Sequence, residues 1–258
     1  MELKTIRTPQ VAVRLFEGGS GEPLVFLHGA GGVTADDPFL AALAAKYRVY
    51  APLLPGYGDS EEAPELREML DITLHYLDLV DALGLKDPIL AGHSMGGMIA
   101  AEMAALDNHR FSRLALIAPA GLWLDAHPIP DIFSLVPYEY PPLLFHNPEA
   151  GAALFTAGAN FDDTEWLKAF LVTNARQLGM AGKILFPVPD RGLSQRIYRV
   201  RAQTLLIWGD DDRLIAPVYA QAWKKAITGA ELAVIPEAGH MVIWEQTGRV
   251  VDALGRLG

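Results

Sequence analysis

The feature that most constrains this chain is Gly92-His93-Ser94-Met95-Gly96, a Gly-x-Ser-x-Gly pattern that directly follows the apolar run 88–91. A strand that turns sharply into a helix holds its turn residue in a strained backbone conformation, and flanking glycines leave room for that turn. The pattern therefore predicts that Ser94 stands between a buried strand and a helix N-terminus, where the helix dipole favours developing negative charge. Chance occurrence is the alternative, and partners for Ser94 elsewhere in the chain would exclude it.

The composition is that of an ordinary globular protein with ample length for a large core, since 51% of the 258 residues are hydrophobic and 20% are charged. There is no cysteine, which excludes disulfides, thiolate catalysis and cysteine-based metal sites. The formal net charge of −10, with no basic run longer than Lys224-Lys225, argues against nucleic-acid binding. Residues 1–15 contain no apolar signal core, and the apolar stretch 114–124 is too short to span a bilayer. We therefore expect a soluble, cytoplasmic protein without a membrane partner.

Strand-like and helix-like segments alternate over the first 120 residues and again after residue 200. Short apolar stretches suited to strands lie at 11–16, 24–27, 47–51, 89–91, 114–118, 204–208 and 232–235. Helical spacing of apolar residues occurs at 39–45, 66–83, 95–106, 218–226 and 242–257. Gly18-Gly19-Ser20-Gly21 predicts a hairpin-like turn between the first two strands. The alternation implies a mostly parallel sheet with helices on both faces.

The alternation stops between residues 122 and 199. This stretch is rich in proline and scattered aromatic residues, and it contains only weak helical patterns. It is too long to be a structureless loop in a compact domain. We expect residues 1–121 and 200–258 to form one α/β core, and residues 122–199 to form a helical cap or lid inserted into it.

A serine hydroxyl becomes a good nucleophile when an oriented base removes its proton. His240 is the candidate base because it follows the strand 232–235, and the loops after parallel strands gather at one edge of the sheet. The histidines in helices, at a helix end and in the insertion are expected to be surface or structural residues. His93 adjoins Ser94 too closely to swing onto its hydroxyl.

An acidic side chain is needed to orient the base, and the segment Asp210-Asp211-Asp212 follows the strand 204–208. For any one of these aspartates, a solvated position that caps the following helix is the alternative. The three together make a carboxylate at this strand end the better interpretation.

Donors for an oxyanion are expected from the glycine-rich segment 28–32, which follows the strand 24–27 at the same edge. The backbone amides of Ala30 and Met95 could form the oxyanion hole. A glycine-rich loop can instead hold a phosphate, but neither the phosphate-binding nor the dinucleotide-binding pattern is present. We expect no cofactor and no metal.

These segments together resemble the α/β-hydrolase superfamily, and the resemblance covers essentially the whole chain. The segments that carry it are 28–31, 55–60, 92–97, Gly209-x-x-Asp212 and Gly239-His240, and the order Ser, Asp, His along the chain is that of the superfamily. The resemblance implies an α/β-hydrolase fold, with a mostly parallel eight-stranded sheet and a helical lid inserted after the sixth strand. It also selects Asp212 as the acid, so that the expected triad is Ser94, Asp212 and His240.

The superfamily includes several chemistries, so the substrate does not follow from the fold. A serine at position 94 disfavours the dehalogenases and epoxide hydrolases, whose nucleophile is an aspartate. The relatives that cleave carbon–carbon bonds commonly have Asn in place of His93 and Trp in place of Met241. We therefore expect a carboxylesterase-type serine hydrolase that cleaves small to medium esters or lactones through an acyl-enzyme on Ser94. A carbon–carbon bond hydrolase of ring-fission products, a cofactor-free perhydrolase and a non-enzymatic sensor of small ligands are the alternatives.

The expected partner is a small-molecule ester, and the oligomeric state does not follow from the sequence. Aromatic and methionine side chains of the insertion and of the segment after His240 could line an apolar acyl pocket. The expected pocket residues are Trp123, Phe145, Phe155, Trp166, Met241 and Trp244. For each of these side chains alone, packing within the protein core is the alternative.

Overall fold

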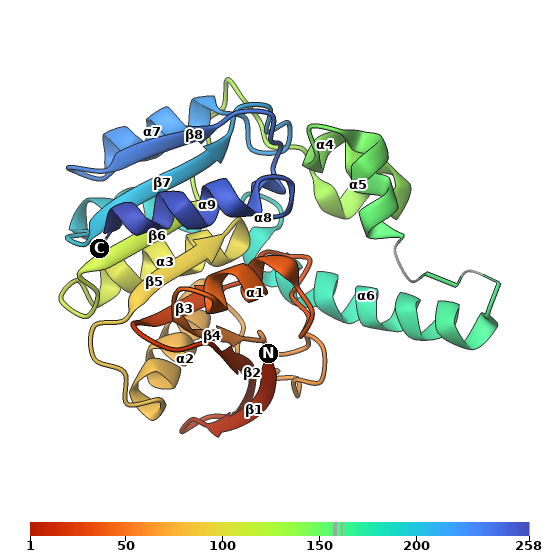
Figure 1. The fold of residues 1–258 in the computed structure, drawn as a ribbon, viewed down its shortest axis with the longest axis horizontal. Coiled ribbons are helices and arrows are strands. Elements are labelled where there is room, and N and C mark those ends of the chain that lie inside the picture. Colours follow the sequence, from red (N-terminus) through yellow and green to blue (C-terminus); the bar gives the residue numbers. More distant parts are fainter. Residues whose placement is uncertain (157–158, 161, 258) are drawn as a thin grey trace.

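The computed structural model is built on an eight-stranded sheet with the strand order β1-β2-β4-β3-β5-β6-β7-β8 (Figure 1). It describes residues 1–156, 159–160 and 162–257, with Phe155 described in its backbone only. The strands are β1 Glu2–Arg7, β2 Ala12–Gly18, β3 Pro23–Leu27, β4 Arg48–Pro52, β5 Ile89–His93, β6 Arg113–Ile117, β7 Gln203–Gly209 and β8 Glu231–Ile235. The pairings of β2 with β1 and with β4 are antiparallel, and the others are parallel. The expected mostly parallel sheet of eight strands is confirmed.

The central strands are buried on both faces, which is why they are apolar without alternation. All five residues of β5 are buried, and so are the last four of β6. The register pairs Leu27 with Gly92, His93 with Ile117, and Ile117 with Ile207. The carboxyl ends of β3, β5, β6 and β7 are therefore level, and the loops that follow them meet at one edge of the sheet.

Helices cover both faces of this sheet. Figure 1 shows α1, α8 and α9 in front of the strands and α2 and α3 behind them. The bounds of the core helices are α1 Pro38–Ala44, α2 Met69–Ala82, α3 Met95–Leu106, α7 Val218–Ala226, α8 Val242–Glu245 and α9 Thr247–Leu254, with a final 3-10 turn, η5 Gly255–Leu257. The sequence gives α1 a sharp start, because the carboxylate of Asp37 accepts the amides of Phe39 and Leu40 and Pro38 occupies the first turn.

Residues 122–199, which we call the cap segment, leave the core after β6 and return to it at β7. Their helices are η1 Ile132–Ser134, η2 Pro137–Glu139, α4 Pro141–Leu144, α5 Pro148–Phe155, α6 Thr164–Leu185, η3 Leu193–Gln195 and η4 Ile197–Arg199. Asn147 and Asp163 are the N-cap residues of α5 and α6. The side chain of each accepts hydrogen bonds from backbone N–H groups in the first turn of its helix. Figure 1 shows α4, α5 and α6 extending beyond the carboxyl edge of the sheet.

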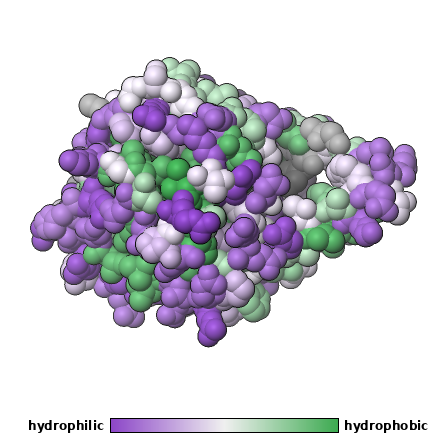
Figure 2. Space-filling view, turned by 90° about the horizontal axis from the view of Figure 1, so that it is seen from below, coloured by the Kyte–Doolittle hydropathy of each residue, from purple (hydrophilic) through white to green (hydrophobic). Residues whose placement is uncertain are grey.

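The surface of the cap segment is mixed in character. Its far end projects from the body of the molecule, and the space-filling view of Figure 2 shows hydrophilic side chains over most of that face, with hydrophobic patches between them. Leu171 and Val172 of α6 are among its exposed apolar residues. None of the described helices is both long enough and apolar enough to cross a membrane.

The predicted hairpin between residues 11–16 and 24–27 is wrong. In the structure β4 lies between β2 and β3, with Val49 paired to Gly18 on one side and to Leu24 on the other. The hairpin lies instead at the N-terminus, where β1 pairs with β2. Glu2 lies opposite Glu17 at one end of this pairing, and Arg7 lies opposite Ala12 at the other. Gly19 adopts a φ of +78°, which allows the chain to turn away from β2 rather than fold back along it.

Candidate active site

Ser94 lies at a strained turn between β5 and α3. Its backbone has φ 53° and ψ −116°, a conformation that residues other than glycine rarely adopt. The turn is held by Ser94 N–H, which donates to Ile117 O at 2.9 Å, and by Ser94 O, which accepts from Ala120 N–H at 3.1 Å. Only glycine fits at position 96, since a Cβ there would lie 2.0 Å from Leu27 O. The glycine thus lets α3 approach β3 closely enough to present Ser94 above the sheet edge.

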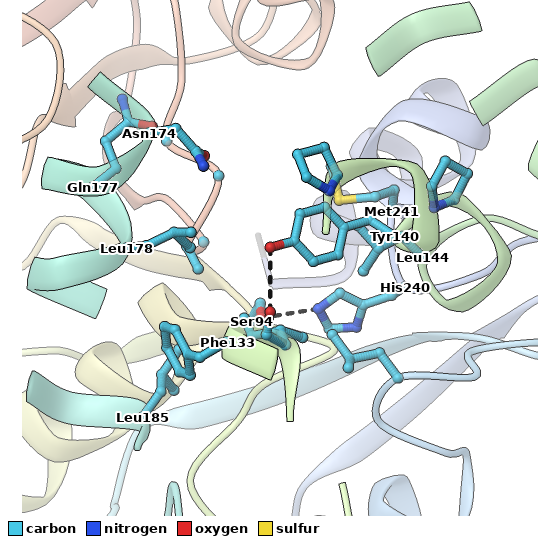
Figure 3. Close-up of a pocket in the computed structure, with 18 of the residues that line it drawn as sticks. Ser94, Phe133, Tyr140, Leu144, Asn174, Gln177, Leu178, Leu185, His240 and Met241 are labelled. Carbon is cyan, nitrogen blue, oxygen red and sulfur yellow. Dashed lines mark hydrogen bonds between the residues drawn. The ribbon is translucent and has the colours of Figure 1, made fainter. Parts of the chain in front are cut away.

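Ser94, His240 and Asp212 form a continuous chain of hydrogen bonds. Ser94 Oγ lies 2.9 Å from His240 Nε2, and His240 Nδ1 lies 2.9 Å from Asp212 Oδ2 (Figure 3 shows the first of these contacts). Asp212 also accepts the amides of Leu214 and Ile215 through Oδ1, at 3.0 and 2.8 Å. The side chains of Ser94, Asp212 and His240 are all buried. This geometry allows His240 to take the proton of Ser94 while Asp212 fixes the imidazole tautomer.

The neighbouring aspartates face other partners. Asp210 accepts the amide of Ala238 at 3.4 Å. Asp211 pairs with Arg213 and lies 2.9 Å from His146 Nδ1. The three consecutive carboxylates thus take three different positions, and Asp212, the one that the resemblance selected, is the one brought to His240.

His93 bonds to the loop 236–241, which carries His240 and which we call the histidine loop. The sequence did not predict this role. Its Nε2 lies 2.9 Å from the carbonyl oxygen of His240, so this nitrogen carries the proton and donates it. Burial, together with the nearby His240, lowers the pKa of His93 to about 3, and the imidazole is neutral in the folded protein. In the sequence, the only sign of a role for His93 is that it adjoins Ser94. This adjacency indicates that His93 does not act on the serine hydroxyl, but it does not reveal the bond to His240.

The segment after β3 passes directly beside Ser94. A Cβ at Gly29 would lie 3.1 Å from His93 Nδ1 and 3.4 Å from the Cβ of Ser94, so a larger residue here would be tightly packed. The loop is held by its carbonyls, because Tyr57 Oη donates to Ala30 O at 2.9 Å and Gly32 N–H donates to Gly29 O at 3.0 Å. Ala30 lines the cavity above Ser94.

A buried histidine fixes the start of this loop. His28 accepts the amide of Leu54 at Nε2 and donates from Nδ1 to Gly29 O, at 3.1 and 2.7 Å. Burial lowers the pKa of His28 to about 4, so the ring stays neutral and keeps one tautomer. Met95 is on the other side of Ser94 as the first residue of α3, where a helix amide has no partner within its own helix. The two segments that carry the predicted oxyanion donors therefore flank the serine.

A cavity of about 880 Å³ opens above Ser94 and His240. Its wall is mostly apolar and comes from both the core and the cap segment. Figure 3 shows Leu144, Phe133, Leu178 and Leu185 around the space over Ser94, with polar groups at Tyr140, Asn174 and Gln177. A cavity of this size and character suits an organic molecule with a substantial apolar part.

Four of the six predicted pocket residues lie on this wall, namely Trp123, Trp166, Met241 and Trp244. The ring of Phe145 is buried beside Trp244, with the two ring centroids 6.4 Å apart, and lies against Gly151. The side chain of Phe155 lies outside what the structure describes.

Beyond Trp166, α6 contributes more of this wall than the sequence led us to expect. Leu167, Phe170, Leu171, Asn174, Gln177 and Leu178 all line the cavity. Their spacing of three and four residues is that of one helical face, and this periodicity was the available signal. Asn174 and Gln177 bring amide groups to a face that is otherwise apolar.

Two parts of the cap segment are bonded to the core separately, and we call them the α4–α5 arm and the α6 arm. The α4–α5 arm is bonded to the histidine loop, because Met241 N–H donates to Leu144 O at 2.8 Å and Glu245 accepts the amides of His146 and Gly239 at 2.8 and 2.7 Å. The α6 arm is bonded elsewhere, through Arg176, which pairs with Glu62 at 3.1 Å. The cavity lies between the two arms.

Among the residues that the structure describes, no group of three or more His, Asp or Glu side chains is arranged to hold a metal ion.

Known proteins resemble this chain over most of its length. A sequence profile of the alpha/beta hydrolase family matches residues 24–253. The chain is 33% identical over 247 residues to the dihydrolipoyllysine-residue acetyltransferase component of the acetoin cleaving system of Pseudomonas putida, a match that covers 92% of this chain and 64% of that protein. The chain thus spans less than two thirds of the length of this relative.

Two further matches extend over nearly the whole of both proteins. The chain is 28% identical over 273 residues to a 2-hydroxy-6-oxo-6-phenylhexa-2,4-dienoate hydrolase of Burkholderia cepacia, covering 95% of this chain and 89% of the relative. The solved meta-cleavage product hydrolase of Pseudomonas fluorescens IP01 has a TM-score of 0.77 at 22% identity, covering 99% of this chain and 98% of that one. Proteins named as lipases and a carboxylesterase are also similar. Since the family profile covers most of the sequence, this chain belongs to the alpha/beta hydrolase family.

Proposed function

We propose that this protein hydrolyses carboxylic esters of small to medium acids, lactones included, through an acyl-enzyme at Ser94. The observation that supports this most directly is the hydrogen-bonded chain from Ser94 through His240 to Asp212, with 2.9 Å at both contacts, beneath an apolar cavity. A neutral ester can enter such a cavity without leaving a charge unpaired.

In the proposed mechanism, Ser94 Oγ attacks the ester carbonyl while His240 Nε2 takes the serine proton. Asp212 holds the imidazole and stabilises its charged form. The amides of Ala30 and Met95 donate to the oxyanion of the tetrahedral intermediate. The carbon–oxygen bond to the alcohol then breaks, and His240 gives its proton to the departing oxygen. Water, deprotonated by His240, attacks the acyl carbon, and His240 returns that proton to Ser94 Oγ as the carbon–oxygen bond to the serine breaks and the acid leaves.

Carbon–carbon bond hydrolysis is the second candidate, because relatives named for that chemistry match nearly the whole chain. The substrate in the name of the Burkholderia cepacia relative is a carboxylate. The described part of the cavity wall contains Asp131 and no lysine or arginine to pair with such an anion. An unpaired carboxylate is costly to bury, so the wall favours a neutral ester.

Two assays on one preparation test the proposal. A fluorophosphonate is expected to label the protein at Ser94, and Ser94→Ala is expected to lose hydrolysis of p-nitrophenyl butyrate by at least about 10³-fold. Ser134→Ala is the matched control, since this serine lies in η1 of the cap segment and bonds to Asp131 O. Labelling at another serine, or activity that survives in Ser94→Ala, would contradict the site.

A vinylogous diketone acid supplied beside the ester separates the two chemistries. Faster turnover of the diketone would replace esterase activity with carbon–carbon hydrolysis. Acylation of Ser94 without release of the acid would point to a ligand-binding protein.

A further inference from the structure

Tyr140 extends from the cap segment toward the nucleophile. It lies between η2 and α4, and its ring lines the cavity. In Figure 3 the Tyr140 hydroxyl points at Ser94 from above, on the side of the cavity where His240 and Met241 lie. Asn174 and Gln177 of α6 stand on the opposite side, so the Tyr140 hydroxyl is the polar group of the cap segment that faces the reacting serine in this view.

The hydroxyl is held in place by the preceding turn. Tyr140 Oη lies 3.2 Å from Ile132 O and 3.5 Å from Leu135 O, and it donates toward these carbonyls. Burial raises the pKa of Tyr140, so the phenol keeps its proton at neutral pH and remains a hydrogen-bond donor. A neutral phenol donor can turn its proton to a charged oxygen that comes close, because hydrogen bonds to charged acceptors are stronger.

The position of Tyr140 relative to the base follows from the bond between Met241 and Leu144. Leu144 ends the short helix that Tyr140 precedes, and its carbonyl accepts the Met241 amide at 2.8 Å. This bond fixes the Tyr140 arm to the residue after His240. In the proposed mechanism, the carbonyl oxygen of an ester at Ser94 faces the segments of Ala30 and Met95. The alkoxy oxygen faces His240, which must protonate it, and therefore also faces Tyr140.

We propose that the Tyr140 hydroxyl contacts the alkoxy oxygen of the bound ester and donates a hydrogen bond to it as the carbon–oxygen bond breaks. This inference rests on the proposed esterase function. The serine–carbonyl bond has formed, the electron pair of the breaking bond moves to the alkoxy oxygen, and that oxygen takes the proton which His240 removed from Ser94. Tyr140 keeps its own proton throughout and stabilises the charge that develops before the transfer.

This role makes the benefit of Tyr140 depend on the alcohol. An alkyl alcohol is a poor leaving group, so much negative charge gathers on its oxygen and a donor there lowers the barrier. A p-nitrophenolate spreads its charge over the ring and needs little help. A residue that only shapes the cavity would instead affect both esters of the same acid in similar proportion.

Tyr140→Phe tests this with ethyl butyrate and p-nitrophenyl butyrate, which share one acyl group. The variant is expected to lose about 10- to 100-fold in kcat/KM on the ethyl ester, the effect of one hydrogen bond to a charged oxygen, and less than about 3-fold on the p-nitrophenyl ester. A series of butyrate esters should show a steeper dependence of log kcat/KM on the pKa of the alcohol in the variant.

Ser134→Ala is the control for loosening of the turn, because its hydroxyl also bonds to a carbonyl of the 131–135 turn, at 2.8 Å from Asp131 O. It should keep both rates, and both variants should unfold at the temperature of the unmodified protein. Equal losses of Tyr140→Phe on the two esters, or no loss on either, would overturn the inference while leaving the esterase function intact. An unmodified protein that hydrolyses neither ester would overturn the function and the inference with it.

Discussion

His93 donates a hydrogen bond from Nε2 to the backbone carbonyl of His240 at 2.9 Å, so the residue beside the nucleophile holds the residue that would act as its base. The two rings lie 5.1 Å apart. The distance between Ser94 and His240 is thus fixed by a third group at the end of β5.

Replacing His93 by Phe should leave a buried carbonyl without its donor. We expect the free energy of unfolding to fall by about 1–3 kcal/mol, the usual penalty for such a group. Because the loop of His240 would then be less well placed, kcat should fall by about 10-fold and KM should change little. Urea unfolding and the kinetics of p-nitrophenyl butyrate hydrolysis measure both effects. An unchanged kcat would show that other contacts position His240.

Three buried histidines predict that the protein loses stability in mild acid. Burial lowers the pKa of His28 and of His75 to about 4, and that of His93 to about 3, from the ordinary 6.5. The unfolded chain therefore binds these protons near pH 6.5, whereas the folded protein does not. Stability is full above about pH 7.5 and falls as pH drops toward 4, by about 1.4 kcal/mol per pH unit for each proton.

His75→Phe isolates one of these protons. In the described structure neither ring nitrogen of His75 has a hydrogen-bond partner, so Phe removes the titration without removing a bond. Urea unfolding from pH 8 to pH 5 should show a slope smaller by about one proton in the variant. A slope identical to that of the unmodified protein would show that His75 titrates normally.

Glu102 and Arg196 join α3 to the end of the cap segment through two contacts, at 3.0 and 2.5 Å. Glu102 is buried, whereas the side chain of Arg196 is 40% exposed. Glu102→Gln should therefore lower the free energy of unfolding by about 1–3 kcal/mol, less than for a fully buried pair. Glu62→Gln, which breaks the exposed pair with Arg176, should lower it by under about 1 kcal/mol. Equal effects in urea unfolding would contradict this ranking.

Two glycine-to-alanine variants should have opposite effects. Gly96→Ala places a Cβ 2.0 Å from Leu27 O and should destabilise the protein by more than about 4 kcal/mol, because α3 must move away from the sheet. Gly179 lies inside α6 with nothing within 4 Å of its Cβ position, so Gly179→Ala should stabilise by about 0.5–1 kcal/mol. Thermal unfolding distinguishes them, and a soluble, stable Gly96→Ala protein would refute the close-packing argument.

The sequence predicts Ser94, His240 and the aspartate segment because each follows an apolar strand, and parallel strands deliver such loops to one edge. The choice of Asp212 needs the family resemblance, since the three aspartates differ only in how the loop directs them. The order of the strands in the sheet cannot be predicted from local sequence patterns, because pairing joins strands that are not consecutive in the chain. The position of β4 between β2 and β3 is an example. The pocket is predicted only in part, because whether a side chain such as Phe145 faces a cavity or a neighbouring residue depends on how the cap segment packs.

The two arms of the cap segment differ in the part of the core to which each is bonded. A displacement of the α4–α5 arm would act on His240 through the bonds of Met241 and Glu245. A displacement of α6 would act on the segment around Glu62, which shares no side chain with the triad. The α4–α5 wall of the cavity is therefore bonded directly to the loop that carries His240, whereas the Arg176 bond ties the α6 wall to the segment around Glu62.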